Sequence, residues 1–223
     1  MNVSPAKENI LKKIRKALTK STPIPFPHSE GNSSVYLPSK QELEIEFAER
    51  FTKLQGKFIF CQNSKELAYQ LNAVVAGNKW EKIFCREEPL RKILAENQFS
   101  NFSWNDLASC DASITTCETL VARTGSIVMS AAQASGRTVS VYAPVHICIV
   151  STSQLVYDVK DAIQKAREKY AGHLPSLITF ATGPSRTADI EKTLVVGVHG
   201  PKEVYVFLVD EPFDPIAGGS AQA

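Results

Sequence analysis

The sequence has no hydrophobic run long enough to cross a membrane. Its longest apolar stretches, 145–150 and 194–198, are interrupted by His146 and Gly197 and stay far below the roughly 18 residues that a membrane span needs. The first residues also lack the apolar block and the small-residue cleavage site of a secretory signal peptide. We therefore expect no membrane span and a cytoplasmic location.

Cysteine is scarce, and its spacing argues against two classes of site. The five cysteines cannot all pair, and none of them form a C-x-x-C motif. This pattern disfavours a disulfide scaffold and a zinc or iron–sulfur site within this chain. We expect no metal and no cofactor here, and five reduced core thiols: Cys61, Cys85, Cys110, Cys117 and Cys148.

Most of the chain has no large excess of positive or negative residues. The net charge of the 223 residues is +2, but residues 1–20 contribute +5 and the remainder −3. Binding to a nucleic-acid backbone requires cations clustered along one face, so we expect no nucleic-acid partner. With 43% hydrophobic and 22% charged residues, the composition is that of one globular domain with an appendage.

The appendage is the basic segment 1–28. Ser4 can cap a helix, Pro5 suits its first position, and the alternating prolines of Thr22–His28 favour an extended linker. The apolar face of this helix has the expected spacing and consists of Ile10, Leu11, Ile14 and Leu18. We expect it to pack on its own domain or on a second copy of the chain, with a membrane-surface helix as the weaker alternative. At the other end, residues 213–223 have nothing to bury and should form a flexible tail.

Residues 29–212 have the pattern of an α/β domain. A helix over 41–55, a strand over 57–61, a helix from Ser64 and a strand over 82–85 make a strand–helix–strand unit. This unit implies parallel strands with helices on both faces and ligands beyond the carboxyl ends of the strands. Further expected elements are a helix over 156–170 and strands at 112–116, 126–130, 138–142, 147–151, 177–181, 193–197 and 203–209. The sheet is therefore expected to be mixed and largely parallel.

The segment Gly183–Asp189 has the residue types of an anion-binding loop. It lies at the end of one expected strand and the start of an expected helix, where free backbone N–H groups and the helix dipole favour a negative charge. The hydroxyls of Ser185 and Thr187 and the guanidinium of Arg186 add further donors. The alternative is that Ser185 or Thr187 only caps the helix while Arg186 is solvated.

Two further segments carry polar groups that suit a site. Glycines flank His199 in the run G-V-H-G-P, so that His199 can act as a proton carrier while Gly200 permits close backbone approach. The alternative for His199 is a structural imidazole in a hairpin. Between two expected strands, Thr124, Gly125 and Ser126 contribute hydroxyls in a loop, although polar turn chemistry also explains them.

A catalytic triad is a weaker alternative. Ser185, Asp189 and His199 follow the chain order of an α/β-hydrolase triad. However, the sequence G-P-S-R-T lacks the G-x-S-x-G elbow that exposes the nucleophile in that fold. We therefore favour a binding loop over a nucleophilic serine.

Four motifs stand in series in the second half of the chain. They are A-R-T-G-S-I-V over 122–128, P-V-H-I over 144–147, G-P-S-R-T-A-D-I-E over 183–191 and G-V-H-G-P over 197–201. In this order they resemble the LUD domain family. The start of the chain, Ile10–Leu18, also resembles members of this family. Two residues depart from the pattern: Arg123 stands where an acidic or small residue is expected, and Ser126 stands where threonine is usual.

The resemblance implies a fold and a pathway. The fold is a three-layer α/β/α arrangement similar to the ribose-5-phosphate isomerase and CoA-transferase group, here with an N-terminal helical arm. The implied pathway is a three-protein system that oxidises L-lactate to pyruvate, in which two companion proteins carry iron–sulfur clusters and this type of chain carries none. The resemblance supplies no catalytic residue set.

We therefore expect one site for a small anionic ligand. Ser185, Arg186 and Thr187 would bind the anion, with His199 and the turn of Thr124–Ser126 facing it across the strand ends. Two functions remain open: a non-metal subunit of a lactate-oxidising complex, or a stand-alone enzyme or binding protein for a phosphorylated or CoA-linked small molecule. The expected partners are iron–sulfur subunits or a second copy of the chain.

Overall fold

The computed structural model describes residues 5–19, 38–39, 41–102, 106–188 and 194–211. The chain divides into two compact units, Met1–Pro38 and Ser39–Ala223, which are treated separately below. The linker expected over 22–28, the tail expected over 213–223 and both expected domain boundaries lie outside the described residues. These boundaries stay predictions.

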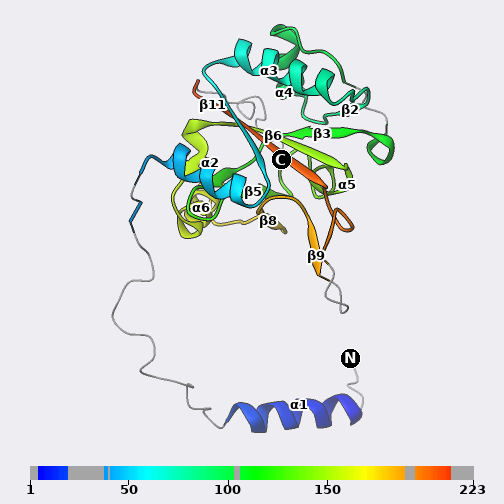
Figure 1. Ribbon diagram of the computed structural model, residues 1–223. Helices are drawn as coiled ribbons and strands as arrows, with labels where there is room; N and C mark the ends of the chain where they lie inside the picture. The colour runs from blue at the N-terminus through cyan, green and yellow to red at the C-terminus, as the bar shows by residue number, and fades with distance from the viewer. Residues whose placement is uncertain (1–4, 20–37, 40, 103–105, 189–193, 212–223) are drawn as a thin grey trace. The chain divides into compact units, whose positions relative to one another are not determined.

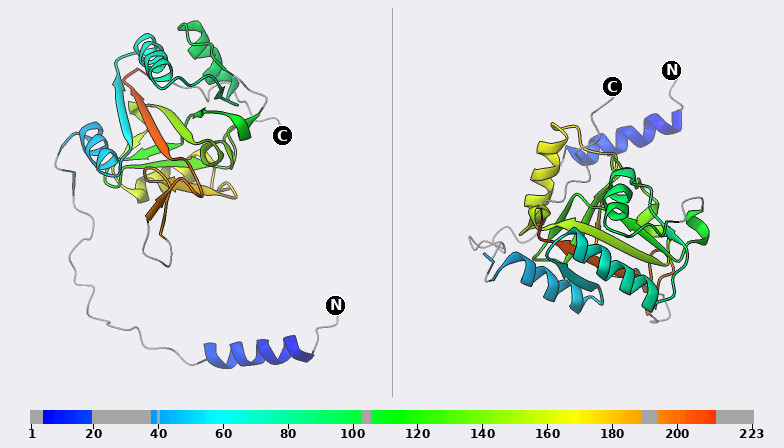
Figure 2. Two further views of the ribbon diagram at one scale, coloured as in Figure 1. Left: turned by 45° about the vertical axis from the view of Figure 1, so that its right-hand side comes forward. Right: turned by 90° about the horizontal axis from the view of Figure 1, so that it is seen from above.

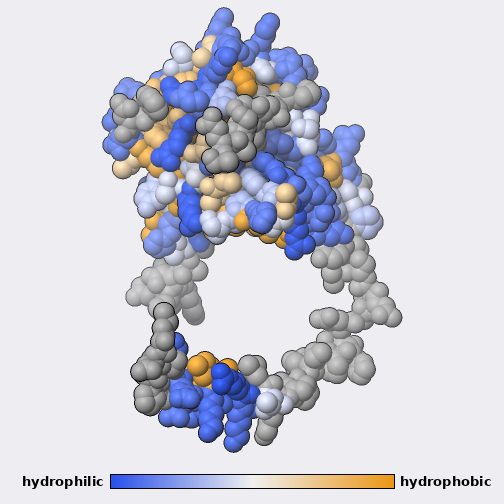
Figure 3. Space-filling model, turned by 180° about the vertical axis from the view of Figure 1, so that it is seen from behind, coloured by the Kyte–Doolittle hydropathy of each residue, from blue (hydrophilic) through white to orange (hydrophobic). Residues whose placement is uncertain are grey.

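The first unit contains one amphipathic helix, α1 (Pro5–Leu18). It begins at Pro5 as the sequence predicts, because the fixed φ of proline suits the first helical position. Ile10 is 58% exposed and Ile14 is 48% exposed, and Figure 3 shows this apolar stripe beside a hydrophilic remainder. Basic residues, including Arg15 and Lys16, occupy its last turn, where cations favour the helix dipole.

The second unit is built on sheet A, a five-stranded parallel sheet with the strand order β1-β11-β6-β3-β2 (Figure 1). Strands β2, β6 and β11 are mostly apolar, as expected for a parallel sheet that is covered on both faces, and the four residues of β3 are all buried. The strands are β1 (Lys57–Cys61), β2 (Ile83–Phe84), β3 (Ala112–Thr115), β6 (Val145–Ser151) and β11 (Glu203–Val209). The expected strand–helix–strand unit is present, but β1 and β2 lie at opposite edges of the sheet.

Helices α3 (Ser64–Gly77) and α4 (Glu88–Glu96) cover one face of sheet A (Figures 1 and 2). Leu67 and Leu71 of α3 and Leu94 of α4 are fully buried against alternate residues of the strands. The sequence predicts Ser64 as the cap of α3, but the cap is Asn63, whose side chain accepts hydrogen bonds from the backbone N–H groups of Lys65 and Glu66.

The other face of sheet A is covered by α2 (Leu43–Lys53) and by a second sheet, sheet B, with the order β7-β4-β5-β8. Phe47 and Phe51 of α2 are fully buried there. Sheet B combines parallel and antiparallel strands: β4 and β7 are parallel, whereas the pairs β4–β5 and β5–β8 are antiparallel. Helix α6 (Val159–Lys169) packs on its outer face. The strands are β4 (Thr119–Val121), β5 (Ser126–Ser130), β7 (Leu155–Val156) and β8 (Ile178–Ala181).

The remaining described elements are small. Strands β9 (Arg186–Ala188) and β10 (Leu194–Val196) form a separate antiparallel pair that projects from the body (Figure 1). Three short helical turns complete the described part: η1 (Leu107–Ser109), α5 (Val139–Tyr142) and η2 (Thr152–Gln154). These observations confirm the predicted α/β fold class. The strand pairing is mixed and largely parallel, helices lie on both sides, and a helix stands at the N-terminus.

The structure corrects three expected elements. The predicted strand at 138–142 is the short helix α5, because Val139 packs with Phe84 and its carbonyl accepts a hydrogen bond from Ser113. Part of the expected loop at 116–126 is strand β4, which pairs with β5. The expected helix after Gly183 is replaced by strand β9, which pairs with β10.

Candidate functional site

A pocket lies at the amino ends of two neighbouring parallel strands. Pro144 immediately precedes β6, Lys202 immediately precedes β11, and the backbone N–H of Lys202 donates to the carbonyl of Pro144 over 2.8 Å. The cavity volume is about 430 Å³. The sequence analysis predicts ligands beyond the carboxyl ends of the strands. This pocket lies at the other edge of sheet A, where β6 and β11 begin. Its lining residues are Val141, Tyr142, Ala143, Pro144, Gly197, Val198, His199, Gly200 and Lys202.

Two glycines allow the loop between β10 and β11 to form one wall of this pocket. Gly197 has a φ of +79°, and a side chain there would collide with the stem of Lys202. A Cβ on Gly200 would lie 2.9 Å from the Cβ of Ser185. Glycine is therefore required at both positions, which supports the predicted role of Gly200 in close backbone approach. The loop joins two different sheets and is not the hairpin that we expected.

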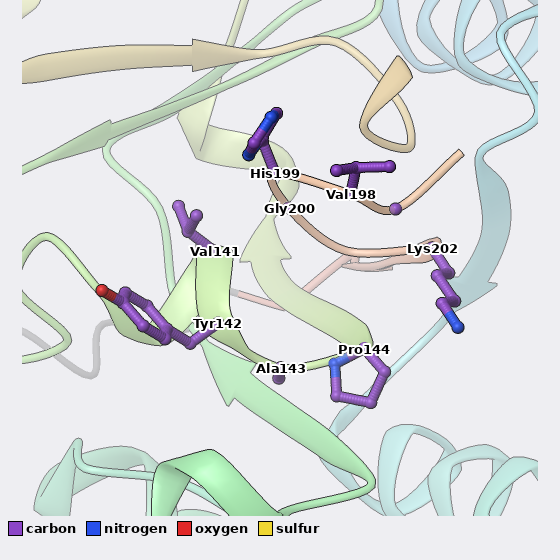
Figure 4. A pocket seen from close by; sticks show the side chains of 9 residues that line it. Val141, Tyr142, Ala143, Pro144, Val198, His199, Gly200 and Lys202 are labelled. Atoms are coloured by element: carbon purple, nitrogen blue, oxygen red, sulfur yellow. The ribbon is translucent and has the colours of Figure 1, made fainter. Parts of the chain in front are cut away.

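The polar side chains stand around the rim of the pocket. In Figure 4, Tyr142 and Lys202 lie at opposite ends of it, and His199 extends from the loop between them. Tyr142 is 69% exposed, and Lys202 makes no ion pair within the described part of the chain. The imidazole of His199 is also exposed and makes no hydrogen bond to any described residue.

Ser185 is the member of the predicted anion loop that lies beside His199 and Gly200. Its backbone N–H donates to the carbonyl of Pro201 over 2.9 Å, and its own carbonyl accepts from the N–H of Gly197 over 2.9 Å. These two bonds attach the segment before β9 to the wall of the pocket. Ser185 is thereby brought to residues that lie 12 and 16 positions later in the sequence.

The other predicted ligand-binding residues have structural partners near the end of α2. Arg186 donates from Nη2 to the carbonyl of Leu54 over 2.8 Å. A Cβ on Gly183 would lie 2.8 Å from the same carbonyl oxygen, and one on Gly125 would lie 2.8 Å from the backbone nitrogen of Phe51. These contacts give Gly125, Gly183 and Arg186 a structural role that needs no bound ligand.

The hydroxyls of the predicted turn form a closed hydrogen-bond chain. Ser126 Oγ lies 2.8 Å from Thr124 Oγ1 and 2.8 Å from Thr182 Oγ1. Thr187 lies in β9 opposite Val195, so it is not in the anion loop that we expected. Asp189 lies outside the described residues.

A buried carboxylate that the sequence did not single out lies at the carboxyl edge of sheet A. Glu87, which follows β2, accepts hydrogen bonds from the Thr116 N–H over 3.0 Å and from the Thr116 hydroxyl over 2.6 Å. Burial raises the pKa of Glu87 above its ordinary value, and the hydrogen bonds from Thr116 only partly offset this effect. Glu87 is therefore stabilised by hydrogen bonds without a paired cation among the described residues.

A second carboxylate, Glu118, joins sheet B to the end of α6. It accepts hydrogen bonds from Ser130 Oγ over 2.5 Å, from the Tyr170 hydroxyl over 2.6 Å and from Lys169 Nζ over 2.6 Å. Burial favours the neutral acid, but these three hydrogen bonds and the charge of Lys169 lower the pKa of Glu118. The sequence alone does not single out Glu118, because its hydrogen-bond partners are up to 52 residues away.

Other buried groups with shifted pKa values lie in and beside the strands of sheet A. His146 is fully buried, lies 2.8 Å from Thr115 Oγ1 through Nε2, and has its pKa lowered to about 4 by burial. The imidazole is therefore neutral at physiological pH. All five cysteines are buried and free, as expected, and burial raises the pKa of Cys61 and of Cys85 to about 12.

Two features are absent from the described residues. No group of three or more His, Cys, Asp or Glu side chains among them is arranged to hold a metal ion. No helix in the described ranges combines the length and apolar composition needed to cross a membrane.

Comparison with known proteins shows what the second half of the chain is similar to. Residues 104–209, which include β3 to β11, match the LUD domain family. The match confirms the resemblance carried by the four sequence motifs. The matched segment includes the loop at the pocket and Glu118 with its hydrogen-bond partners.

Several curated relatives of the LUD domain are named lactate utilization protein C. The protein of Shouchella clausii is 36% identical over 53% of this chain and 52% of its own length. The protein of Exiguobacterium sp. is 27% identical over 92% of this chain and 96% of its own length. The alignment thus spans about half of the first relative and nearly all of the second.

A solved structure supports the fold. The crystal structure of a DUF162 family protein from Deinococcus radiodurans superposes with a TM-score of 0.58 at 20% identity. The match covers 78% of this chain and 99% of that chain. At this level of identity the likeness concerns the fold alone.

Proposed function

We propose that this protein is a non-metal subunit of an L-lactate utilization system that oxidises L-lactate to pyruvate. The observation that carries the proposal is the similarity of 92% of the chain to lactate utilization protein C of Exiguobacterium sp.. The LUD domain supports the same assignment. In this proposal the protein acts in the cytoplasm and binds a small organic anion in the pocket formed by the β10–β11 loop.

The electron carriers are proposed to reside in iron–sulfur partner proteins. The placement of this chain's own thiols supports that division, because a cluster is held by several cysteines and the described residues contain no group of three or more His, Cys, Asp or Glu side chains that could hold a metal ion. All five thiols are buried, and burial raises the pKa of Cys61, Cys85, Cys110 and Cys117. Thiols of this kind are poorly suited to ligate a cluster.

The proposal is tested by growth and by affinity capture. Deletion of the gene should abolish growth on L-lactate while growth on pyruvate is retained, and the wild-type gene should restore growth. A tagged copy should capture proteins whose iron and acid-labile sulfide are measurable and whose reduced clusters give an electron paramagnetic resonance signal. Normal growth of the deletion strain on L-lactate, or capture without iron, would contradict the proposal.

A second function is favoured by the size of the pocket. A cavity of about 430 Å³ falls in the range of about 300–1,000 Å³ that holds drug-sized ligands, whereas lactate is much smaller. The chain would then be a stand-alone enzyme or binding protein for a phosphorylated or CoA-linked small molecule. This alternative predicts ligand binding by the isolated protein without any iron–sulfur partner.

A further inference from the structure

We infer that the pocket at the β10–β11 loop takes an organic anion that carries a planar ring and is longer than lactate. The inference rests on the small-anion site proposed above and names the class of its ligand. Three features carry it: the donors that line the pocket, the exposed tyrosine at one end, and the distribution of charge along the rim.

The donors are backbone groups and one ammonium. The N–H groups of Val198, His199 and Gly200 donate to no acceptor in the described part of the chain. Lys202 adds a positive charge whose stem is held against Gly197. Consecutive free N–H groups next to a cation form a favourable environment for an anion.

The described lining contains no acidic side chain that would oppose an anion. The nearest carboxylate in the sequence, Glu203, is already paired with Lys57. Lys202 therefore keeps an uncompensated charge at the mouth of the pocket. A carboxylate or phosphate is the ligand group that this arrangement favours.

The rest of the lining suits an apolar or aromatic body. Tyr142 is 69% exposed, Val198 is 54% exposed and Val141 is 37% exposed, although all three are large side chains. Exposed apolar groups that gather around one pocket are typical of a binding surface. The ring of Tyr142 offers a face on which a planar ligand group stacks.

The placement of these groups sets the length of the ligand. Tyr142 and Lys202 lie at opposite ends of the pocket, with His199 between them (Figure 4). A ligand that stacks on Tyr142 and pairs with Lys202 must span the cavity. Lactate has no ring that could stack on Tyr142, whereas a mononucleotide has a ring at one end and an anionic group at the other.

The test uses AMP as the probe, titrated into the full-length protein by calorimetry. Tyr142→Ala and Lys202→Gln should each weaken AMP binding about fivefold or more, as expected for loss of a stacking contact or a charge-assisted contact. Tyr142→Phe should retain the wild-type affinity because the ring remains. Inorganic phosphate and L-lactate should each bind at least about tenfold more weakly than AMP.

A second surface pocket provides matched controls, since it contains Lys65 and an exposed tyrosine, Tyr69. Lys65→Gln and Tyr69→Ala should leave AMP binding unchanged. Unaltered thermal midpoints in all five variants would show that the exposed positions do not affect folding. AMP binding that survives both pocket substitutions, or L-lactate binding as tight as AMP, would overturn the inference.

The same variants separate this inference from the proposed pathway. If deletion of the gene blocks growth on L-lactate but AMP does not bind, the ligand class is wrong and the pathway assignment stands. If AMP binds in the predicted manner but the deletion strain grows normally on L-lactate, the pathway assignment is wrong and the ligand class stands.

Discussion

At the scale of single residues, Glu118 should make the stability of the fold depend on pH. A carboxyl whose pKa is lowered in the folded state stabilises the fold above its unfolded pKa and loses that contribution as the pH falls. The ordinary value for Glu118 is 4.5 and its folded pKa is lower, so the contribution is full above pH 4.5 and disappears below it. Glu118→Gln should therefore reduce the free energy of unfolding at pH 7 by about 1–3 kcal/mol and flatten its dependence on pH below about 4.5.

Urea unfolding of wild type and variant at several pH values measures this effect. Glu88→Gln is the matched control, because Glu88 also pairs with a cation, Arg91, but its side chain is 70% exposed. An exposed pair contributes little, so this change should cost less than about 1 kcal/mol. Equal losses in the two variants would show that the hydrogen bonds of Glu118 add nothing to stability.

Residue types alone indicated part of the pocket and missed the rest. The run around His199 was recognisable because glycines on both sides of a polar residue indicate close backbone approach. Tyr142 and Lys202 could not be identified, since each lies in the pocket only because β6 and β11 are neighbours. Arg186 was assigned to an anion because its partner, the Leu54 carbonyl, is 132 residues away.

At the scale of elements, two glycines with the same backbone conformation allow the contact between Gly125 and helix α2 to be measured. Gly125 has φ +63° and Gly136 has φ +64°, so alanine is strained at both. A Cβ at Gly125 would meet the backbone of Arg50 and Phe51 within 3.1 Å, whereas one at Gly136 would meet nothing within 4 Å.

Gly136→Ala should therefore cost only the conformational strain of about 1–3 kcal/mol. Gly125→Ala should cost at least about 1 kcal/mol more, because the clash with the last turn of α2 forces backbone to move. Chemical denaturation gives both values, and the difference between them isolates the contact. Similar losses would mean that α2 adjusts without cost.

The elements that the sequence predicted correctly have long apolar patterns, and the errors have short ones. Strand β11 and helix α3 follow from their own periodicity. The β-branched residues of 138–142 favour a strand locally, but burial of Val139 in a small cluster makes them a helical turn. For so short a segment, tertiary contacts outweigh local preference.

At the scale of the whole molecule, the strand order of sheet A was beyond the reach of the sequence. The parallel class followed from the strand–helix–strand pattern, but nothing local shows that β1 pairs with β11. That pairing brings together segments 146 residues apart, as the contact between Lys57 and Glu203 illustrates. The amino-edge pocket arises from the same long-range order, because it needs β6 and β11 side by side.

The described hydrophobic core lies entirely outside the N-terminal arm, and this leads to a prediction about stability. Every buried residue of the four hydrophobic clusters lies in the second unit, so a chain that starts at Ser39 should keep its core. Its thermal midpoint should change by less than about 3 °C, which corresponds to about 1 kcal/mol in a domain of this size. Calorimetry measures the midpoint, and a fall of more than about 5 °C would show that the arm stabilises the body.

The same truncation should weaken capture of the iron–sulfur partners that the proposed function implies. Residues 1–20 carry a net charge of +5, and α1 exposes Ile10 and Ile14, which is the pattern of a helix that binds a complementary groove. The double substitution of Ile10→Ser and Ile14→Ser keeps the charge and removes the apolar face, so it should reduce capture as strongly as the truncation. Full capture by the double variant would mean that charge alone makes the contact, and full capture by the truncated chain would mean that the partners bind the α/β body.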